Sequence, residues 1–208
     1  MNIVHTDIVE YLLNSTPEHD AVLHDMEQYA HTCNFPIIGP LVGRMLFVLA
    51  KASKATRILE LGSGFGYSAY WFAKAIGKRG TIICTEGDSA NAKRALAYHR
   101  RGKVARQITF LTGDALELID EADGQFDIIF NDIDKHQYPK AFRKALPRLR
   151  KGGLLISDNA LWSGKILGRK PDADTAGILT YNRLIYSSKK LFTTIVPLRD
   201  GVSISIKL

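Results

Sequence analysis

Two groups of acidic residues in the sequence have the composition of a site for a hard divalent cation. Asp132 and Asp134 follow one apolar segment, and Asp158 and Asn159 follow another. If both segments are neighbouring parallel strands, their carboxyl ends meet at the same edge of a sheet, where ligands bind in open α/β folds. Carboxylates gathered there repel one another unless a cation lies between them. Oxygen donors without His or Cys select Mg²⁺, Ca²⁺ or Mn²⁺, and Mg²⁺ is the ion we expect. The alternative is that these residues cap helices and form a salt bridge with Lys135.

A glycine-rich turn earlier in the chain predicts a nucleotide-type ligand. The apolar segment 58–61 is followed by Gly62, Gly64 and Gly66, and then by a helix-like stretch from Tyr67. A strand, a glycine turn and a helix open nucleotide-binding α/β domains, because the glycines let the backbone approach the ligand and the helix N-terminus points at it. The third glycine comes one residue too early for a dinucleotide fingerprint, which argues against NAD. A glycine-rich turn without any ligand is the alternative.

Two further strand ends carry residues suited to a nucleoside. Glu86 ends an apolar segment, where a carboxylate can accept hydrogen bonds from both hydroxyls of a ribose. Gly113, Asp114 and Ala115 follow the next apolar segment. Glu86 could instead be a surface acid that opens the following helix, and Asp114 could be an ordinary helix N-cap. Three strand ends that all carry ligand-binding residues favour a cofactor more strongly than any one of them alone.

The elements that must position these residues alternate between strands and helices. We predict strands over 58–61, 80–86, 107–112, 126–130 and 153–157, and helices over 67–76, 88–101, 114–119, 137–149 and 172–188. The β-rich segments 191–196 and 202–207, joined by a Pro- and Gly-containing turn, predict an antiparallel hairpin. Residues 1–53 are predicted to form a helical cap, broken at 35–40, that precedes a Rossmann-like core over 54–208. The predicted fold is therefore one α/β domain with a doubly wound, seven-stranded sheet that ends in the hairpin.

The composition is that of a globular chain that folds without a membrane. The 208 residues are 46% hydrophobic and 24% charged, which fits one domain with a sizeable core. No apolar run reaches the roughly 20 residues of a membrane span, and the first residues lack the pattern of a secretory signal, so we expect a cytoplasmic protein. Cys33 and Cys84 do not have the spacing of a zinc site or a disulfide framework. The net charge is +7, and the segments 89–113 and 135–153 contain Lys and Arg but no acid. We interpret them as solvated helix faces, with an RNA-binding surface as the alternative.

The glycine turn resembles motif I of the methyltransferases that depend on S-adenosylmethionine (SAM). The pattern is Glu-x-Gly-x-Gly-x-Gly-Tyr-Ser. The resemblance implies that SAM is the cofactor and that the fold is the class I methyltransferase sheet. It assigns the cofactor contacts of this turn to Glu60, Gly62, Gly64, Gly66, Tyr67 and Ser68. It also implies that the Gly113-Asp114-Ala115 segment binds the adenine, with the Asp114 carboxylate accepting from its exocyclic amine.

The later motifs resemble one branch of that class, the cation-dependent O-methyltransferases that include the caffeoyl-CoA and catechol enzymes. The resemblance rests on Phe-x-Asp-x-Asp-Lys at 130–135 and Asp-Asn-x-Leu-Trp-x-Gly at 158–164, and covers roughly residues 35–208. It implies that Asp132, Asp158 and Asn159 hold the cation, that Asp132 also contacts the cofactor, and that Lys135 is the base. It places Ile38, Trp162 and Arg199 in the substrate pocket, where Arg199 replaces a small residue of the family and Asn131 an apolar one.

The resemblance implies that a methyl group moves from SAM to a hydroxyl of a catechol-like aromatic molecule, with a divalent cation present. Because no covalent enzyme intermediate is required, positioning and proton removal are the tasks left to the protein. The family also suggests a homodimer. Relatives that methylate 5-hydroxyuridine in tRNA have similar motifs, so tRNA is the alternative acceptor. A non-catalytic SAM-binding module is a third hypothesis, which Lys135 and the aligned cation ligands argue against.

Overall fold

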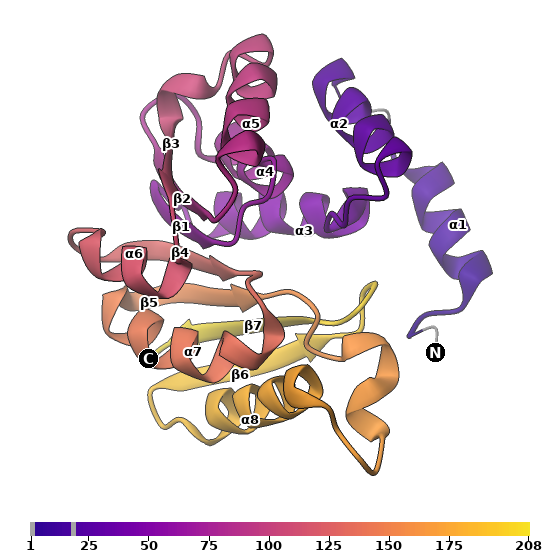
Figure 1. Ribbon diagram of the computed structural model, residues 1–208, viewed down its shortest axis with the longest axis vertical. Helices are drawn as coiled ribbons and strands as arrows, with labels where there is room; N and C mark the ends of the chain where they lie inside the picture. The colour runs from indigo at the N-terminus through magenta and orange to yellow at the C-terminus, as the bar shows by residue number, and fades with distance from the viewer. Residues whose placement is uncertain (1–2, 18–19) are drawn as a thin grey trace.

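The computed structural model describes residues 3–17 and 20–208, and their strands form one mixed sheet of seven in the order β3-β2-β1-β4-β5-β7-β6 (Figure 1). The strands are β1 (Arg57–Leu61), β2 (Thr81–Glu86), β3 (Ile108–Thr112), β4 (Phe126–Asn131), β5 (Leu149–Ser157), β6 (Leu191–Val196) and β7 (Val202–Lys207). The first five are parallel, and β7 is antiparallel to both β5 and β6. This topology confirms the predicted class I methyltransferase fold with its C-terminal hairpin.

Helices cover both faces of the sheet. The longer ones are α1 (Thr6–Ser15), α2 (Ala21–Thr32), α3 (Gly39–Ala52), α4 (Tyr67–Ile76), α5 (Ser89–Arg101), α6 (Ala115–Glu121), α7 (Tyr138–Arg148) and α8 (Ala173–Ser187). Three short 3-10 helices are η1 (Ala105–Gln107), η2 (Lys135–Gln137) and η3 (Trp162–Leu167). Helices α2 to α5 lie on one face and α6 to α8 on the other.

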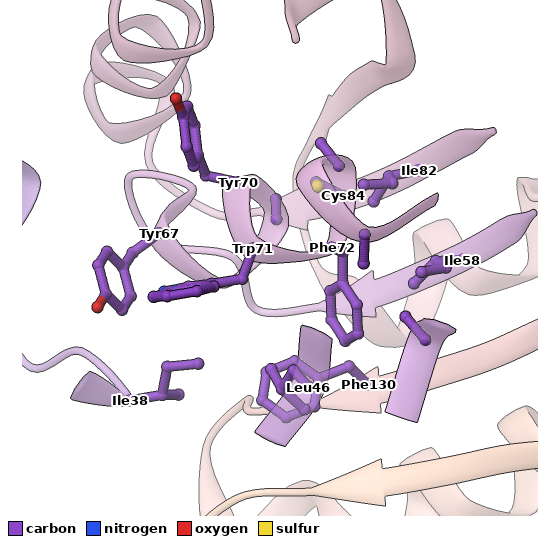
Figure 2. Packing of buried hydrophobic residues seen from close by; sticks show 14 of the residues in the cluster. Ile38, Leu46, Ile58, Tyr67, Tyr70, Trp71, Phe72, Ile82, Cys84 and Phe130 are labelled. Atoms are coloured by element: carbon purple, nitrogen blue, oxygen red, sulfur yellow. The ribbon is translucent and has the colours of Figure 1, made fainter. Parts of the chain in front are cut away.

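The core is divided by the sheet because side chains alternate along each strand. In β1, Ile58 joins the cluster under α3 and α4, whereas Leu59 and Leu61 join the cluster under α6 to α8. Figure 2 shows the first cluster, where the rings of Phe72 on α4 and Phe130 on β4 meet edge to face with their centroids 5.8 Å apart. Both faces of β1 are therefore buried, and its carboxyl end is a rigid base for the turn that follows.

The N-terminal segment is helical, as predicted, but its helices differ in how they pack. Helices α2 and α3 contribute buried residues to the core, whereas α1 lies at the margin of the molecule and buries none (Figure 1). The apolar side chains that α1 exposes are Ile8, Tyr11, Leu12 and Leu13. Within the described part of the chain, every helix is too short or too polar to cross a membrane.

Strand β5 begins four residues earlier than predicted. The sequence predicts its start at Gly153, but pairing with β4 already begins at Leu149 and shifts register between Phe126 and Ile128. Arg150 stays in the strand because its guanidinium pairs with Asp127 on β4. The irregular start contains polar residues and glycine, which carry no strand signal on their own. The 3-10 helix η3 was not predicted either.

Asp127 links three strands at their amino ends. Its Oδ2 accepts hydrogen bonds from the backbone nitrogens of Thr56 at 2.7 Å and Arg57 at 2.8 Å, and from the Thr56 hydroxyl at 3.0 Å. Its Oδ1 pairs with Arg150. Burial alone raises the pKa of Asp127, but the Arg150 guanidinium and these N–H donors outweigh it and lower the pKa. The charged carboxylate therefore fixes the starts of β1, β4 and β5.

Candidate active site

A cleft of about 710 Å³ opens at the carboxyl ends of the five parallel strands. Each strand end contributes to it, and the segment between α2 and α3 closes it with Phe35, Pro36 and Ile37. The other lining residues are Gly62, Gly64, Thr85, Glu86, Gly87, Gly113, Asp114, Ala115, Asp132, Ile133, Asp134, Lys135, Gln137, Asp158, Asn159, Trp162 and Arg199. The cleft thus collects residues that are up to 164 positions apart, since 199 − 35 = 164.

The glycine turn forms one wall, and its conformation requires glycine. Gly62 and Gly64 have φ values of +78° and +50°, which L side chains rarely adopt. A Cβ on Gly62 would lie 2.8 Å from the carbonyl oxygen of Asp132, and one on Gly64 would lie 3.0 Å from the ring of Phe35. The Gly64 nitrogen donates to Glu86 at 2.7 Å. The turn is therefore locked between β2, β4 and the N-terminal segment.

Four predicted cofactor residues of the turn do not line the cleft itself. Glu60 is fully buried beneath the turn, where its carboxylate accepts from the hydroxyl of Ser68. Burial raises the pKa of Glu60 to about 7, although hydrogen bonds from Ser68 and Cys84 oppose it. Tyr67 donates its hydroxyl to Glu27 and lines a small adjoining cavity with Ser68. Gly66 faces away from the cleft, so the contacts of these residues with a cofactor stay predictions.

His99 supports the turn from behind. Its Nε2 lies 2.9 Å from the carbonyl oxygen of Gly66, and its side chain is buried. A Cβ on Gly66 would lie 2.6 Å from the imidazole ring, so the ring fits only against glycine. Burial lowers the pKa of His99 to about 4, which leaves the imidazole neutral at neutral pH. This role could not be predicted from the sequence, because His99 lies within a basic helical stretch.

Glu86 and Asp114 combine a structural contact with a place in the cleft. Glu86 accepts from Gly64, from the backbone of Asp88 at 3.0 Å and from Asn91 at 3.1 Å. Asp114 is the N-cap of α6, since its Oδ1 accepts from the Leu116 nitrogen at 2.6 Å. Asp114 is therefore a helix N-cap, as the alternative interpretation predicted. The carboxylates of Glu86 and Asp114 also line the cleft.

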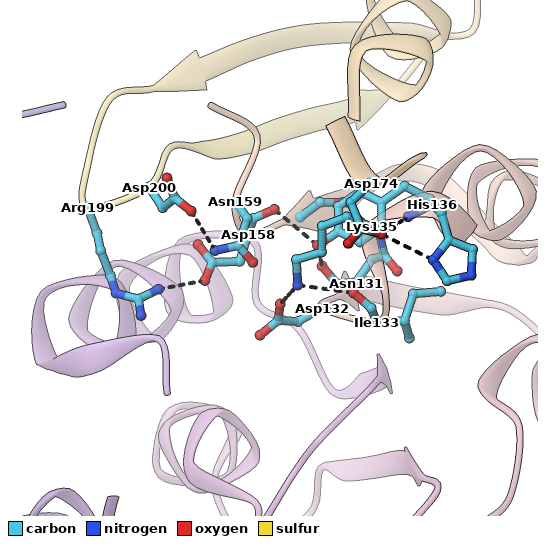
Figure 3. A network of polar contacts seen from close by, with 12 residues as sticks. Asn131, Asp132, Ile133, Lys135, His136, Asp158, Asn159, Asp174, Arg199 and Asp200 are labelled. Atoms are coloured by element: carbon cyan, nitrogen blue, oxygen red, sulfur yellow. Dashed lines mark hydrogen bonds and ion pairs between the residues drawn. The ribbon is translucent and has the colours of Figure 1, made fainter. Parts of the chain in front are cut away.

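The acidic end of the cleft brings together the predicted cation ligands (Figure 3). Asp158 is 1% exposed, and its Oδ2 lies 3.1 Å from Nη1 of Arg199. Its buried Oδ1 has no hydrogen-bond partner among the described residues. The Asn159 amide nitrogen donates to Asp200 at 3.1 Å, which leaves its side-chain oxygen as an acceptor. Asp132 completes the set. Within residues 3–17 and 20–208 there is no cluster of three or more His, Cys, Asp or Glu that could hold a metal; this set has two carboxylates and one amide.

These donors fit a hard cation. Burial, and then the nearby charge of Asp132, raise the pKa of Asp158 to about 7, although Arg199 and Lys135 oppose the shift. Burial also raises the pKa of Asp132, although the positive charge of Lys135 acts to lower it. A buried carboxylate that has one oxygen without a partner and is destabilised by a second carboxylate is an environment that a divalent ion would relieve. Asp134, by contrast, is exposed at the start of η2.

Lys135 lies between the acids and the aromatic wall. Its Nζ is 2.9 Å from Oδ1 of Asp132 and 3.0 Å from the carbonyl oxygen of Ile133. The same nitrogen lies 5.8 Å from the ring centroid of Trp162 and 5.5 Å from that of Tyr138. The predicted base, cation ligand and pocket wall are thus in direct contact.

The predicted substrate-pocket residues fall in two cavities. Trp162 and Arg199 line the cleft, but Ile38 does not: it is buried and lines a second cavity of about 500 Å³, to which α1 contributes Val9 and Leu13. Arg199 lines both cavities. Sequence analysis did not identify Asp200, which holds Asn159 and accepts from the backbone of Ser163.

Comparison with known proteins identifies the family. Residues 14–208 match the sequence model of a family described as O-methyltransferase. The chain belongs to the O-methyltransferase family. This O-methyltransferase is 32% identical over 179 residues to a catechol O-methyltransferase of Niastella koreensis, with 81% of each chain covered. It is 26% identical to caffeoyl-CoA O-methyltransferase 1 of Arabidopsis thaliana, with 95% of this chain and 83% of the plant protein covered.

A solved structure supports the same grouping. The O-methyltransferase of Bacillus cereus in complex with SAH aligns with a TM-score of 0.89 at 26% identity, covering 98% of both chains. The predicted family is therefore confirmed. The roles predicted for single residues are not tested by these similarities and stay predictions.

Proposed function

We propose that this O-methyltransferase moves a methyl group from SAM to a hydroxyl of a catechol-like aromatic small molecule and needs a divalent cation to do so. The observation that carries the proposal is the cleft, because one cavity is lined both by Gly62, Gly64 and Glu86 and by Asp132, Asp158, Asn159 and Lys135. The relative from Niastella koreensis is named a catechol O-methyltransferase, and the Bacillus cereus structure holds SAH, both of which support it.

The end of the cleft at Gly62 and Gly64 suits the cofactor. Both residues line the cavity and carry no Cβ, so a ligand can approach their backbone closely. Glu86 can accept from ribose hydroxyls, and the free carboxylate oxygen of Asp114 can accept from an adenine amine. When bound, SAM supplies a methyl group that its own sulfonium activates.

Asp132, Asp158 and Asn159 would hold the divalent cation, and Mg²⁺ is the ion that we propose. When bound, the ion supplies Lewis acidity, which favours the ionised form of a coordinated hydroxyl. Asp200 orients Asn159, and Arg199 holds the second oxygen of Asp158. Both contacts fix the donor atoms before any ligand arrives.

Lys135 would take the proton of the reacting hydroxyl at its Nζ. The nitrogen is 2.9 Å from the carboxylate of Asp132, so a hydroxyl beside Asp132 is within its reach. Trp162 and Ile133 are apolar residues of the cleft lining, against which an aromatic ring could pack. Holding the ring in line with the methyl donor supplies a large part of the rate.

The test is methyl transfer from labelled SAM to catechol, to an acyl-CoA phenol and to tRNA, each with and without chelator. We expect transfer to a vicinal diol that chelator abolishes and Mg²⁺ restores. Calorimetric titration should detect binding of S-adenosylhomocysteine and none of NAD. Transfer that persists in chelator would remove the cation from the proposal, and tight NAD binding would remove the cofactor.

One observation favours tRNA as a second candidate acceptor. A cavity of about 650 Å³ is lined by four cations, Lys78, Arg100, Lys103 and Arg106. It lies where α4 and α5 end, at the amino edge of the sheet and therefore opposite the cleft. A phosphate-rich ligand could bind there, but its separation from the cleft makes the small-molecule acceptor our first choice. The protein could instead retain tRNA that contains 5-hydroxyuridine, with a retention that falls steeply as salt rises, and methylate it. That result would make tRNA the preferred acceptor over a small molecule.

A homodimer is also part of the proposal. The apolar side chains Ile8, Tyr11 and Leu12 of α1 are exposed on a helix that buries none of its own residues. A second copy would cover them. Light scattering that gives the mass of one chain at micromolar concentration would exclude the dimer.

A further inference from the structure

We propose that Arg199 selects methyl acceptors that carry an anionic group, such as a carboxylate, next to the hydroxylated ring. The inference rests on the proposed function, because it names the class of acceptor for the same cleft. Arg199 is not in the cofactor turn or among the cation ligands. It lies in the turn between β6 and β7, and its side chain extends into the acidic end of the cleft (Figure 3).

The backbone at Arg199 is in a conformation that favours glycine. Its φ is +52°, where a side chain with a Cβ is strained. Nothing in the hairpin register requires an arginine there, since pairing between β6 and β7 ends at Val196 and Val202. A residue placed at the cost of backbone strain beside a cleft is more consistent with a role for its side chain than with turn formation.

Most N–H donors of the Arg199 guanidinium make no hydrogen bond within the described part of the protein. Nη1 donates to Asp158 at 3.1 Å, and within residues 3–17 and 20–208 no other acceptor takes a hydrogen bond from Arg199. Its neighbour Asp200 does not neutralise it, because that carboxylate accepts from Asn159 and Ser163. The side chain is 41% exposed. The remaining N–H groups therefore face solvent in the cleft, where they can bind a carboxylate or phosphate in a bidentate manner.

The position of Arg199 defines where the anion would lie. The residue lines the cleft, with Lys135 and Trp162, and also the second cavity, with Ile38 and Val9. A ring held against Trp162 would direct a substituent towards Arg199, at the junction of the two cavities. The acceptor class is therefore a hydroxylated aromatic acid, with space beyond the anion for an apolar extension.

A purely structural role for Arg199 makes a different prediction. If the guanidinium only balances the charge of Asp158, then removing it would affect anionic and neutral acceptors equally. If it binds the acceptor, only the anionic one loses affinity. The ratio between two matched acceptors separates the two roles and cancels the intrinsic reactivity of each acceptor.

The experiment compares 3,4-dihydroxybenzoate with its methyl ester, which keeps the diol and removes the charge. We would measure kcat/KM for both with the wild-type protein, Arg199→Gly and Arg199→Lys. Glycine suits the positive φ. Lysine keeps the positive charge but lacks the paired N–H donors of the guanidinium. Arg169→Gly is the matched control, because Arg169 is exposed and lines neither cavity.

We expect the acid-to-ester ratio of kcat/KM to fall about 10- to 100-fold in Arg199→Gly, the range for a charged hydrogen bond. Arg199→Lys should lie in between, and Arg169→Gly should keep the wild-type ratio. A wild-type ratio that survives Arg199→Gly overturns the inference and leaves the proposed function intact.

A titration of the protein saturated with S-adenosylhomocysteine tests Arg199 without turnover. The acid should bind the wild-type protein more tightly than the ester does, and Arg199→Gly should remove that difference. Equal affinity of acid and ester for the wild-type protein overturns the inference. Absence of methyl transfer to either compound, with the binding difference present, would count against the proposed reaction and not against Arg199.

Discussion

The side-chain nitrogen of Lys135 lies 2.9 Å from Oδ1 of Asp132, three residues before it in the chain. The sequence left two roles open for this lysine, a salt bridge with Asp134 or a base at the reacting hydroxyl. The structure pairs Lys135 with Asp132 and leaves Asp134 exposed. Only 14% of the lysine side chain is exposed, and it lies over the ring of Trp162. The contact therefore belongs to the cleft and not to the outer surface.

Substitution of Lys135 tests the proposed base. We expect Lys135→Ala to lower kcat by about 10²- to 10⁴-fold, the usual contribution of a positioned base, with unchanged affinity for S-adenosylhomocysteine. Raising the pH should partly restore the rate, because hydroxide can replace a base but not a salt bridge. Lys140→Ala, an exposed lysine on α7, is the control. Normal turnover with only a lower melting temperature would make Lys135 a structural residue.

Removal of a proposed cation ligand should abolish the dependence on Mg²⁺ together with activity. Asp158→Ala deletes one of two charged donors and leaves the ion under-coordinated. We expect turnover to fall to the level of the chelator-treated wild-type protein, and added Mg²⁺ to give no recovery. Asp123→Ala, an exposed acid at the opposite edge of the sheet, should behave like the wild type. Full turnover of the chelator-treated wild type would show that the ligand assignment is wrong.

The glycine turn can be tested with two glycines that both have a positive φ. Gly64 has a φ of +50° in the cleft, and Gly77 has a φ of +71° at the end of α4, where a Cβ meets no atom within 4 Å. Both Gly64→Val and Gly77→Val should therefore lower the melting temperature through backbone strain. Only Gly64→Val should lose binding of S-adenosylhomocysteine in calorimetry. Equal affinity of the two variants would mean that the turn does not contact the cofactor.

Glu60 predicts how the free energy of unfolding changes with pH. Burial raises its pKa from 4.5 to about 7, so between these values the folded state holds a proton that the unfolded state has lost. Stability from this group is therefore present at low pH and is lost as the pH rises through about 7. We would measure the free energy of unfolding in urea from pH 5 to pH 8. Over this range, the value for Glu60→Gln should rise relative to that of the wild type by up to about 3 kcal/mol. Glu121→Gln, at the exposed end of α6, should show no such gain; a gain of the same size there would argue against the burial effect.

Local patterns were sufficient to predict the strand ends. The run 128–130 is apolar because β4 is buried on both faces, so the polar residues that follow it, Asn131 and Asp132, had to lie near the strand end where the cleft forms. The same logic located Glu86, Asp114 and Asp158. Each of these predictions needed only the spacing of side chains along one strand.

Contacts between distant segments could not be predicted in this way. The alternation of side chains along β1 turns Glu60 under α4, where it pairs with Ser68, and its contact with the cofactor stays a prediction. His99 supports Gly66 from a helix whose sequence indicates only a basic surface. The reach of Arg199 to Asp158 joins residues 41 positions apart, and no local pattern encodes that distance.

The two ends of the parallel strands differ in how the charge of a carboxylate with little exposure is compensated. At the amino edge, Asp127 has all its charge compensated by Thr56, Arg57 and Arg150. At the carboxyl edge, Asp158 keeps one oxygen without a partner. The compensated carboxylate and the one with an unpaired oxygen are thus separated by the length of a strand. If the proposed cation site is correct, substitutions that raise heat resistance should be made around Asp127, because replacing the buried charge of Asp158 would stabilise the fold at the cost of turnover.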